Sequence, residues 1–458
     1  MAEGIWRIAE FKGLDQSLYE QSIAEGASPD LQNVRCEGGC LETVRGCVKY
    51  TPEGVPGGIH SLAVFYSRVK PVLLAINEEG VYSLGGEGWE LRYAQEGLGR
   101  ASFLNYAKDG QDVILLATGG QTLWWNGEDE MEPLPGAPEG LRHLALHYER
   151  VWGAGRTDEP DTVYWSRPYD PNDWTPHAQM PEAGGGFVLM PTWNGGRVRG
   201  LKNYFGDVVV FKDSDIFRIY GTYPGNYEVV RVHGVSGPVA ERTVVPWGDR
   251  VFFFSRDGLC AYNGVTARPV DKERVRVFFD GIDYDRAQDT ACAAVHKDRL
   301  YLALPEKGAE GNSAILEIDL LRDIWTLRRG VRVNDFLAWD GKLLFCNDTG
   351  YVYALDEGET YDGAPIDAYW TSKPMDFGRK GMRKRGGKLR VNGSGEAVFR
   401  QRDERGERAQ AVRLARGRPA AARLRGVGYS MRLRVENRSG RPFCIEGGIE
   451  WDVEADEE

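Results

Sequence analysis

The feature that most constrains the fold of this chain is a pair of short apolar runs that recurs along most of its length. In the clearest copy, residues 251–264, the run 251–254 is followed by Ser-Arg-Asp-Gly and then by a second run that ends at Asn263-Gly264. Asp-Gly between apolar runs is a strong hairpin signal, and Asn-Gly marks a further turn. We therefore interpret the unit as two β-strands joined by a tight turn.

The unit recurs at a period of about 46 residues between residues 59 and 355, which fits a four-stranded propeller blade of about 40 to 50 residues. These runs are apolar on both faces, as expected of strands packed between neighbouring blades. The third unit lacks the Gly-rich turn, so six blades and seven blades both remain open. The first runs of the units are 72–76, 113–117, 150–155, 208–211, 251–254, 300–304 and 343–346.

The composition supports a chain made of strands. Aromatic residues are 11% of the sequence and favour strands, while 58 glycines supply turns. We predict an all-β fold, a six- or seven-bladed β-propeller with an extended N-terminal arm and a small C-terminal antiparallel β-sandwich. The predicted domains are 1–50, the arm and ring-closing strand; 51–378, the propeller; and 379–458, the Arg-rich sandwich with an acidic tail.

The N-terminal arm is polar and rich in turns, with isolated apolar residues that cannot form a core of their own. Its last part, residues 41–50, reads as a strand, and we expect it to close the ring by pairing with the last blade, 336–355. At the other end of the chain, residues 379–453 alternate apolar with charged positions. This pattern predicts a sandwich with one buried and one wet face, built on its own core.

Charge is unevenly distributed. Residues 379–441 hold 20 Lys and Arg against 5 Asp and Glu, whereas the whole chain carries a net charge of −11. Such a bipolar chain can stack on copies of itself or on acidic partners, and the alternative is a solvated Arg-rich face. Nucleic-acid contact is expected only in passage, because no aromatic residues are interleaved for base stacking. The candidate interaction residues here are Arg379, Lys380, Arg383, Lys384 and Arg385.

No motif in the sequence predicts catalysis. His143 and His147 are four residues apart but lack the Glu of a zinc-protease motif, and Cys36, Cys40 and Cys47 lack the usual zinc spacing. Asp residues such as Asp257 are interpreted as turn formers. We therefore predict that the protein is not an enzyme and has no catalytic, cofactor-binding or metal-binding residues, and no cofactor.

The seven cysteines are an odd number and mostly lie in apolar runs, which favours packed thiols in a reducing compartment. The start of the chain lacks the basic and apolar regions of a signal peptide. No apolar run reaches the length of about 18 residues that a membrane-spanning helix needs. We expect a protein made in a cytoplasm, without a membrane span.

The order of parts resembles a family of phage proteins, the propeller proteins of the tail hub or nozzle and the related virion stabilisation proteins of podovirus-like tails. The likeness covers about residues 10 to 375. Each motif alone is weakly specific, and the order in which the motifs occur is what indicates the family. The segments that carry it are Gly13-Leu14-Asp15, 26–34, 38–46, 150–155, 163–174, 211–221 and 254–264.

This resemblance implies a structural virion protein, synthesised in the cytoplasm of a bacterial host. It further implies a ring of identical copies, expected to be a hexamer, below the head-to-tail connector and in contact with other tail proteins. The family supplies no catalytic residues, and it does not explain the Arg-rich C-terminal domain.

Two other functions remain open on the sequence. A carbohydrate-binding or glycan-hydrolysing propeller would use exposed aromatic residues at the blade loops as stacking platforms, and Trp174 and Trp193 are the candidates. Packing between blades is the competing role for these tryptophans. A protein-interaction scaffold of a bacterium is the third hypothesis, which only the neighbouring genes would separate from a tail protein.

Overall fold

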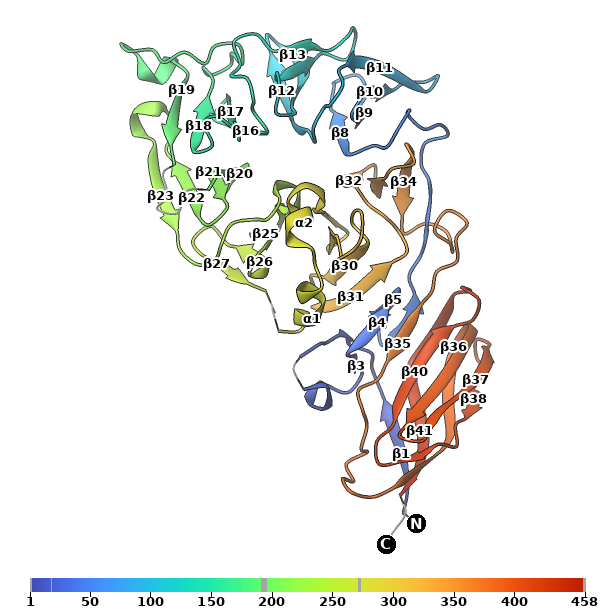
Figure 1. The fold of residues 1–458 in the computed structure, drawn as a ribbon. Helices are drawn as coiled ribbons and strands as arrows, with labels where there is room; N and C mark the ends of the chain where they lie inside the picture. The colour runs from blue at the N-terminus through green and yellow to red at the C-terminus, as the bar shows by residue number, and fades with distance from the viewer. Residues whose placement is uncertain (1, 18, 191–195, 271–272, 456–458) are drawn as a thin grey trace.

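The computed structural model describes residues 2–17, 19–190, 196–270 and 273–455. Seven four-stranded antiparallel sheets are arranged around a common axis as the blades of a propeller, and a separate eleven-stranded sheet lies at one side of this wheel (Figure 1). The predicted all-β propeller is confirmed, and within the described residues the blade count is seven.

The first three blades follow one another along the chain and have the same strand order. Blade 3 keeps four strands although its second and third strands lack the Gly-rich turn of the other units. The strands are β8 (Ser61–Phe65), β9 (Val72–Ile76), β10 (Gly80–Leu84) and β11 (Trp89–Ala94); β12 (Ser102–Lys108), β13 (Gln111–Ala117), β14 (Leu123–Trp125) and β15 (Glu132–Pro133); and β16 (His143–His147), β17 (Arg150–Ala154), β18 (Thr162–Trp165) and β19 (Gly186–Leu189).

The next three blades repeat the pattern, and the opening motif of the sequence forms β25 and β26 of blade 5. The strands are β20 (Val198–Tyr204), β21 (Asp207–Lys212), β22 (Ile216–Tyr220) and β23 (Glu228–Val232); β24 (Val245–Trp247), β25 (Arg250–Ser255), β26 (Gly258–Tyr262) and β27 (Ala267–Pro269); and β28 (Cys292–His296), β29 (Arg299–Leu304), β30 (Ala314–Asp319) and β31 (Ile324–Arg329). Two short helices, α1 (Arg276–Asp280) and α2 (Tyr284–Thr290), connect blade 5 to blade 6.

Blade 7 closes the wheel with a strand from the other end of the chain. It contains β32 (Asp335–Trp339), β33 (Lys342–Cys346) and β34 (Val352–Leu355), and its fourth strand is β7 (Cys47–Lys49). Val48 pairs with Ala354, so the expected pairing between the N-terminal segment and the last blade is found. It is limited to three residues, because β6 (Cys40–Thr43) leaves the ring and joins the eleven-stranded sheet.

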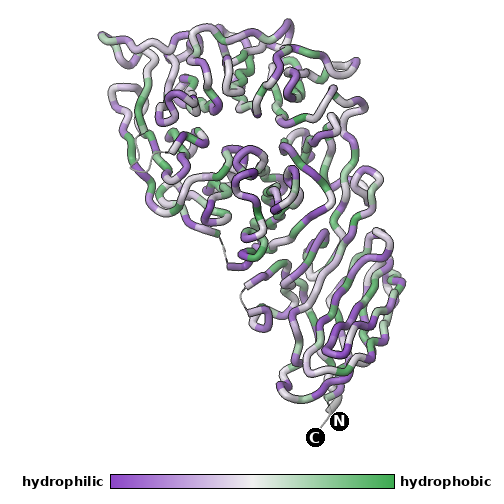
Figure 2. The backbone as a smooth tube through the Cα atoms, in the orientation of Figure 1, coloured by the Kyte–Doolittle hydropathy of each residue, from purple (hydrophilic) through white to green (hydrophobic). Residues whose placement is uncertain are grey.

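Apolar side chains fill the space between each pair of adjacent blades. Figure 2 shows hydrophobic stretches along the blade strands, from which these side chains come. In the last gap, Leu62 and Val64 of blade 1 pack with Leu344 and Cys346 of blade 7. Burial of both faces of a blade therefore requires two neighbours, and the closed ring supplies them to all seven.

The C-terminal sheet is built together with the N-terminal arm. Four neighbouring strands form the centre of this sheet, in the order β35 (Tyr369–Thr371), β40 (Arg432–Asn437), β36 (Lys384–Asp403) and β41 (Phe443–Ala455). β36 lies between β41 and the strands β38 (Ala420–Arg423) and β39 (Val427–Gly428) over its first half, and between β37 (Gly406–Leu414) and β40 over its second half. From the arm, β1 (Ala2–Ile8), β4 (Asp30–Gln32), β5 (Val34–Glu37) and β6 extend this sheet.

The expectation that residues 379–453 have their own core is wrong. Phe11 of the arm packs edge-on against Trp370, and the same apolar cluster continues into Trp325 and Leu327 of blade 6. The two remaining arm strands, β2 (Gly13–Leu14) and β3 (Ala27–Ser28), pair with each other, and β2 lies beside β31 of blade 6. The arm's isolated apolar residues are therefore buried between the C-terminal sheet and the propeller, and they join the two.

Candidate functional site

The predicted basic residues do not all reach the surface. Lys380 and Arg385 are exposed, whereas Arg379 and Arg383 are half-buried. Lys384 is only 1% exposed, and its Nζ donates a hydrogen bond to the carbonyl oxygen of Tyr429 at 2.9 Å. Burial lowers the pKa of Lys384. Alternation along β36 turns Lys384 inward and Arg385 outward, so Lys384 is corrected from an interaction residue to a structural one.

Four exposed cations, Arg385, Lys388, Arg423 and Arg425, form what we call the basic face, on β36 and around the end of β38. Lys388 and Arg423 lie directly opposite each other on adjacent strands. Among the residues that the structure describes, no carboxylate lies within 4 Å of any of these four side chains, although Glu454 is opposite Arg385 in register. Like charges directly opposite each other destabilise a sheet, so folding gains nothing from this pair.

Other arginines of the same sheet do have carboxylate partners. Arg390 makes a bidentate ion pair with Asp452, at 2.6 and 2.8 Å. Arg400 and Arg434 both bond to Glu436, and Arg432 pairs with Glu20 of the arm. The segment 379–441 therefore contains arginines neutralised by carboxylates, one of them on the arm, as well as the unpaired cations of the basic face.

Of the two tryptophans proposed as carbohydrate platforms, only Trp174 lies within the described residues. Trp174 is buried, 9% exposed, in the apolar cluster between blades 2 and 3, and its Nε1 donates to the carbonyl oxygen of Pro171 at 2.8 Å. It offers no ring face to a sugar, so its expected exposure is wrong and the packing role holds. Trp193 lies outside the described residues.

A buried ionic cluster lies where the arm and the chain after blade 7 cross blade 6. Glu317 and Arg328 are fully buried, and Arg328 Nε is 2.7 Å from a Glu317 oxygen. Arg35 of the arm bridges Glu317 and Asp356, at 2.6 Å each. Burial alone would raise the pKa of Glu317, but Arg328 and Arg35 hold this pKa below its usual range. The sequence analysis did not predict this cluster; its signal was Glu317 and Arg328, charged residues within two otherwise apolar runs.

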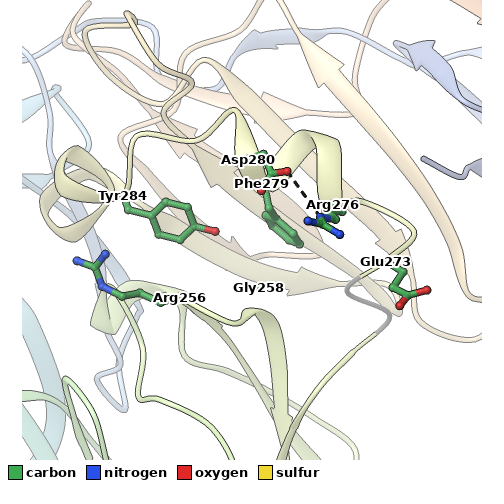
Figure 3. Close-up of a pocket in the computed structure, with 7 residues that line it drawn as sticks. All are labelled: Arg256, Gly258, Glu273, Arg276, Phe279, Asp280 and Tyr284. Carbon is green, nitrogen blue, oxygen red and sulfur yellow. Dashed lines mark ion pairs between the residues drawn. The ribbon is translucent and has the colours of Figure 1, made fainter. Parts of the chain in front are cut away.

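A hollow at α1 and α2 has a volume of about 510 Å³. Figure 3 shows Arg256 and Tyr284 on one side of it, Arg276, Phe279 and Asp280 from α1, and Glu273 farther away. Arg276 and Asp280 face each other across 3.8 Å. Burial raises the pKa of Tyr284 to about 12, so its hydroxyl stays protonated. The residues that line this hollow carry charges of both signs and include no activated nucleophile. The lining therefore does not indicate a catalysed reaction.

The two histidines singled out in the sequence make separate contacts. His143 Nδ1 lies 2.5 Å from Glu241 Oε2, and His147 Nε2 lies 3.2 Å from the carbonyl oxygen of Gly221. Across the described ranges there is no group of three or more His, Cys, Asp or Glu side chains that could hold a metal ion. None of the seven cysteines forms a disulfide bond within the described residues, and five of them are buried.

Glu241 makes stability depend on pH. Burial would raise its pKa, but His143 and Lys202 outweigh burial and lower the pKa from its ordinary value of 4.5 to about 2. The resulting stabilisation is complete above pH 4.5 and disappears as the pH falls to about 2, and it amounts to about 3 kcal/mol at most. We expect the stability advantage of the wild type over Glu241→Gln to shrink by that amount between about pH 6 and about pH 2. Urea unfolding of both proteins across this range measures it, and a difference that does not change with pH would contradict it.

Comparisons with known proteins identify no family for this chain. No family model and no curated protein matches the chain. Similar solved structures include a computationally designed protein, with 14% identity, 67% of this chain and 98% of that chain covered, and a TM-score of 0.41. The Neurospora crassa Pan2 WD40 domain shows 10% identity over 69% and 96%, with a TM-score of 0.41. PorZ, a surface component of the type-IX secretion system of Porphyromonas gingivalis, shows 10% identity over 76% and 44%, with a TM-score of 0.41.

The seven-bladed assignment itself comes from the strand pairing of this chain. No helix among the described residues is both long and apolar enough to span a membrane.

Proposed function

We propose that this chain is a structural component of a phage tail, of the hub or nozzle kind. It assembles as a ring of copies, with a hexamer expected, and contacts the head-to-tail connector and other tail proteins. It is made in the bacterial cytoplasm, resides in the virion and has no enzymatic role. The support is the resemblance of its arm and repeat motifs to that family, together with one surface whose charge folding does not use.

The observation that carries the proposal is the basic face. A sheet with Lys388 directly opposite Arg423 would be more stable with either residue replaced by a neutral one, and we infer that a partner supplies the negative charge. Residues 1–378 of the same chain hold 37 Lys and Arg against 56 Asp and Glu, which makes the body of a second copy a complementary surface. A contact between two different surfaces of neighbouring copies closes into a ring when the rotation permits.

Nucleic acid suits the basic face less well than an acidic protein surface does. The exposed residues of β36, β37 and β38 include no aromatic side chain on which a base could stack, since Phe399 is buried. A flat sheet surface with four cations suits the carboxylates of a protein neighbour, which guanidinium groups bind in a bidentate manner.

The test is charge reversal on the basic face. The variant Lys388→Glu/Arg423→Glu should fold as the wild type does but lose the ring, both alone and with the connector, in native mass spectrometry. Its matched control, Arg68→Glu/Lys70→Glu, makes the same change in net charge on an exposed loop of blade 1 and should leave assembly intact. Equal assembly of both variants, or a wild type that stays monomeric with and without the connector, would refute the proposal.

A further inference from the structure

A second concentration of arginines lies at one mouth of the propeller axis. The first strands of the blades contact one another around this axis, as β12, β16 and β20 do. A cavity of about 380 Å³ opens beside them, and Figure 1 shows α2 near the middle of the wheel on the same part of the molecule. Five arginines line it, four from connections between blades and Arg199 from β20, and we call them the arginine site: Arg100, Arg142, Arg197, Arg199 and Arg242.

Two of these arginines are neutralised by partners at the wall. Arg199 pairs with Asp213 and donates to Gln288 Oε1, and Arg242 pairs with Asp335. Glu241, which also lines the cavity, is already bound by His143 and by Lys202 at 3.3 Å. Asp213, Asp335 and Glu241 are therefore each paired with a cation other than the remaining three arginines.

Arg100, Arg142 and Arg197 have no carboxylate within 4 Å in the described part of the chain. Arg100 only donates to the carbonyl oxygen of Asn334, at 2.7 Å. Asp289 is the one other carboxylate on the cavity wall. Room for a guanidinium is kept open by Gly119, which has φ +91°, and where a Cβ atom would lie 2.9 Å from Arg142 Cζ. Three cations thus face one carboxylate in a confined space.

The protonation of neighbouring groups responds to this excess of positive charge. Burial, Arg199 and Arg142 lower the pKa of Arg197. Burial and the charge of Arg100 lower the pKa of His60 to about 4, so this imidazole is neutral at physiological pH. Arginines that disfavour one another's charge lack a counter-ion, and an anion in the cavity would supply it.

We propose that the arginine site binds a small multivalent anion of the phosphate class, with two or more phosphate groups. Guanidinium forks match phosphate oxygens in a bidentate geometry, and a cavity of this volume lies within the range of small-ligand sites. Arg100, Arg142 and Arg197 come from the connections before blades 2, 3 and 4, so an anion with several phosphate groups can offer a separate group to each of them. The bound anion would tie three blades together at the axis.

The experiment uses the full-length protein with inorganic tripolyphosphate as probe, followed by calorimetry and by thermal unfolding. We expect saturable one-to-one binding, a rise in melting temperature, and an affinity that falls by about tenfold for each arginine removed in Arg142→Ala and Arg197→Ala. Both side chains are exposed and unpaired, so the variants should fold without the anion as well as the wild type does. ATP in a second arm separates a nucleotide from free polyphosphate: tighter binding of ATP means that the base contributes.

A control variant on the basic face tests whether anion binding is specific to the arginine site. Lys388→Ala/Arg423→Ala should bind tripolyphosphate as the wild type does, because the basic face is remote in the fold from the axis. No heat of binding in the wild type at millimolar tripolyphosphate would overturn the proposal. Equal losses in the axial and control variants would overturn it too, because that result would mean diffuse attraction to cations.

Discussion

Glu317→Gln should destabilise the protein by about 3 to 5 kcal/mol, although the substitution changes the side-chain volume very little. Glu317 is fully buried and accepts hydrogen bonds from Arg35, Arg299 and Arg328. Removing its charge leaves these arginines with Asp356, Asp319 and Glu37 as their acidic partners, and Arg328 has no access to water that would solvate it. The loss appears as a lower urea midpoint, and because Arg35 belongs to the arm, the arm's strands should also exchange amide hydrogens faster.

The matched control for this prediction is Glu407→Gln. Glu407 pairs with Arg400 at 2.9 Å, but both side chains are more than a third exposed, so the substitution should cost less than about 1 kcal/mol. A Glu317→Gln loss as small as that of the control would show that the buried cluster does not join the arm to blade 6.

Gly46→Ala should be the second severe substitution, with a cost of at least about 3 kcal/mol. Gly46 separates β6 of the C-terminal sheet from β7 of the propeller, and a Cβ atom there would lie 1.8 Å from the backbone oxygen of Thr360. One of the two segments must move, and the three-residue pairing of β7 with β34 is the weaker attachment. Hydrogen exchange should therefore speed up in blade 7, together with a fall in thermal stability.

Gly86→Ala gives the comparison for Gly46. It makes the same chemical change on a turn of blade 1, where no atom lies within 4 Å of an added Cβ, so it should alter stability by less than about 0.5 kcal/mol. If the two variants unfold alike, the close approach of residues 46 and 360 does not hold the ring shut.

The propeller could be predicted from the sequence because its cause is local and repeated. Each blade needs a run such as 251–254, a turn such as Asp257-Gly258, and apolar residues on both faces. All three features can be recognised in the amino-acid sequence. The number of blades was less certain, because the turn between β17 and β18 departs from the others while the four strands persist. Ring closure was visible as a strand-like stretch, but its division between β6 and β7 was not.

The rest depended on contacts between segments far apart in the chain. The arm and residues 379–453 each show alternation, yet only the fold reveals that Phe11 and Trp370 share one core. Lys384 and Arg385 look equivalent in the sequence, and the register of β36 decides which of them is buried. The arginine site draws on four connections between blades, so no spacing in the sequence could have indicated it.

The measurement that tests the assembly account most directly is an electron cryo-microscopy reconstruction of the purified chain mixed with the head-to-tail connector. The account predicts a closed ring of copies in which Lys388 and Arg423 are covered by an acidic surface of the neighbouring protein. A chain that remains monomeric beside the connector, or a ring that leaves this face open to solvent, would contradict it.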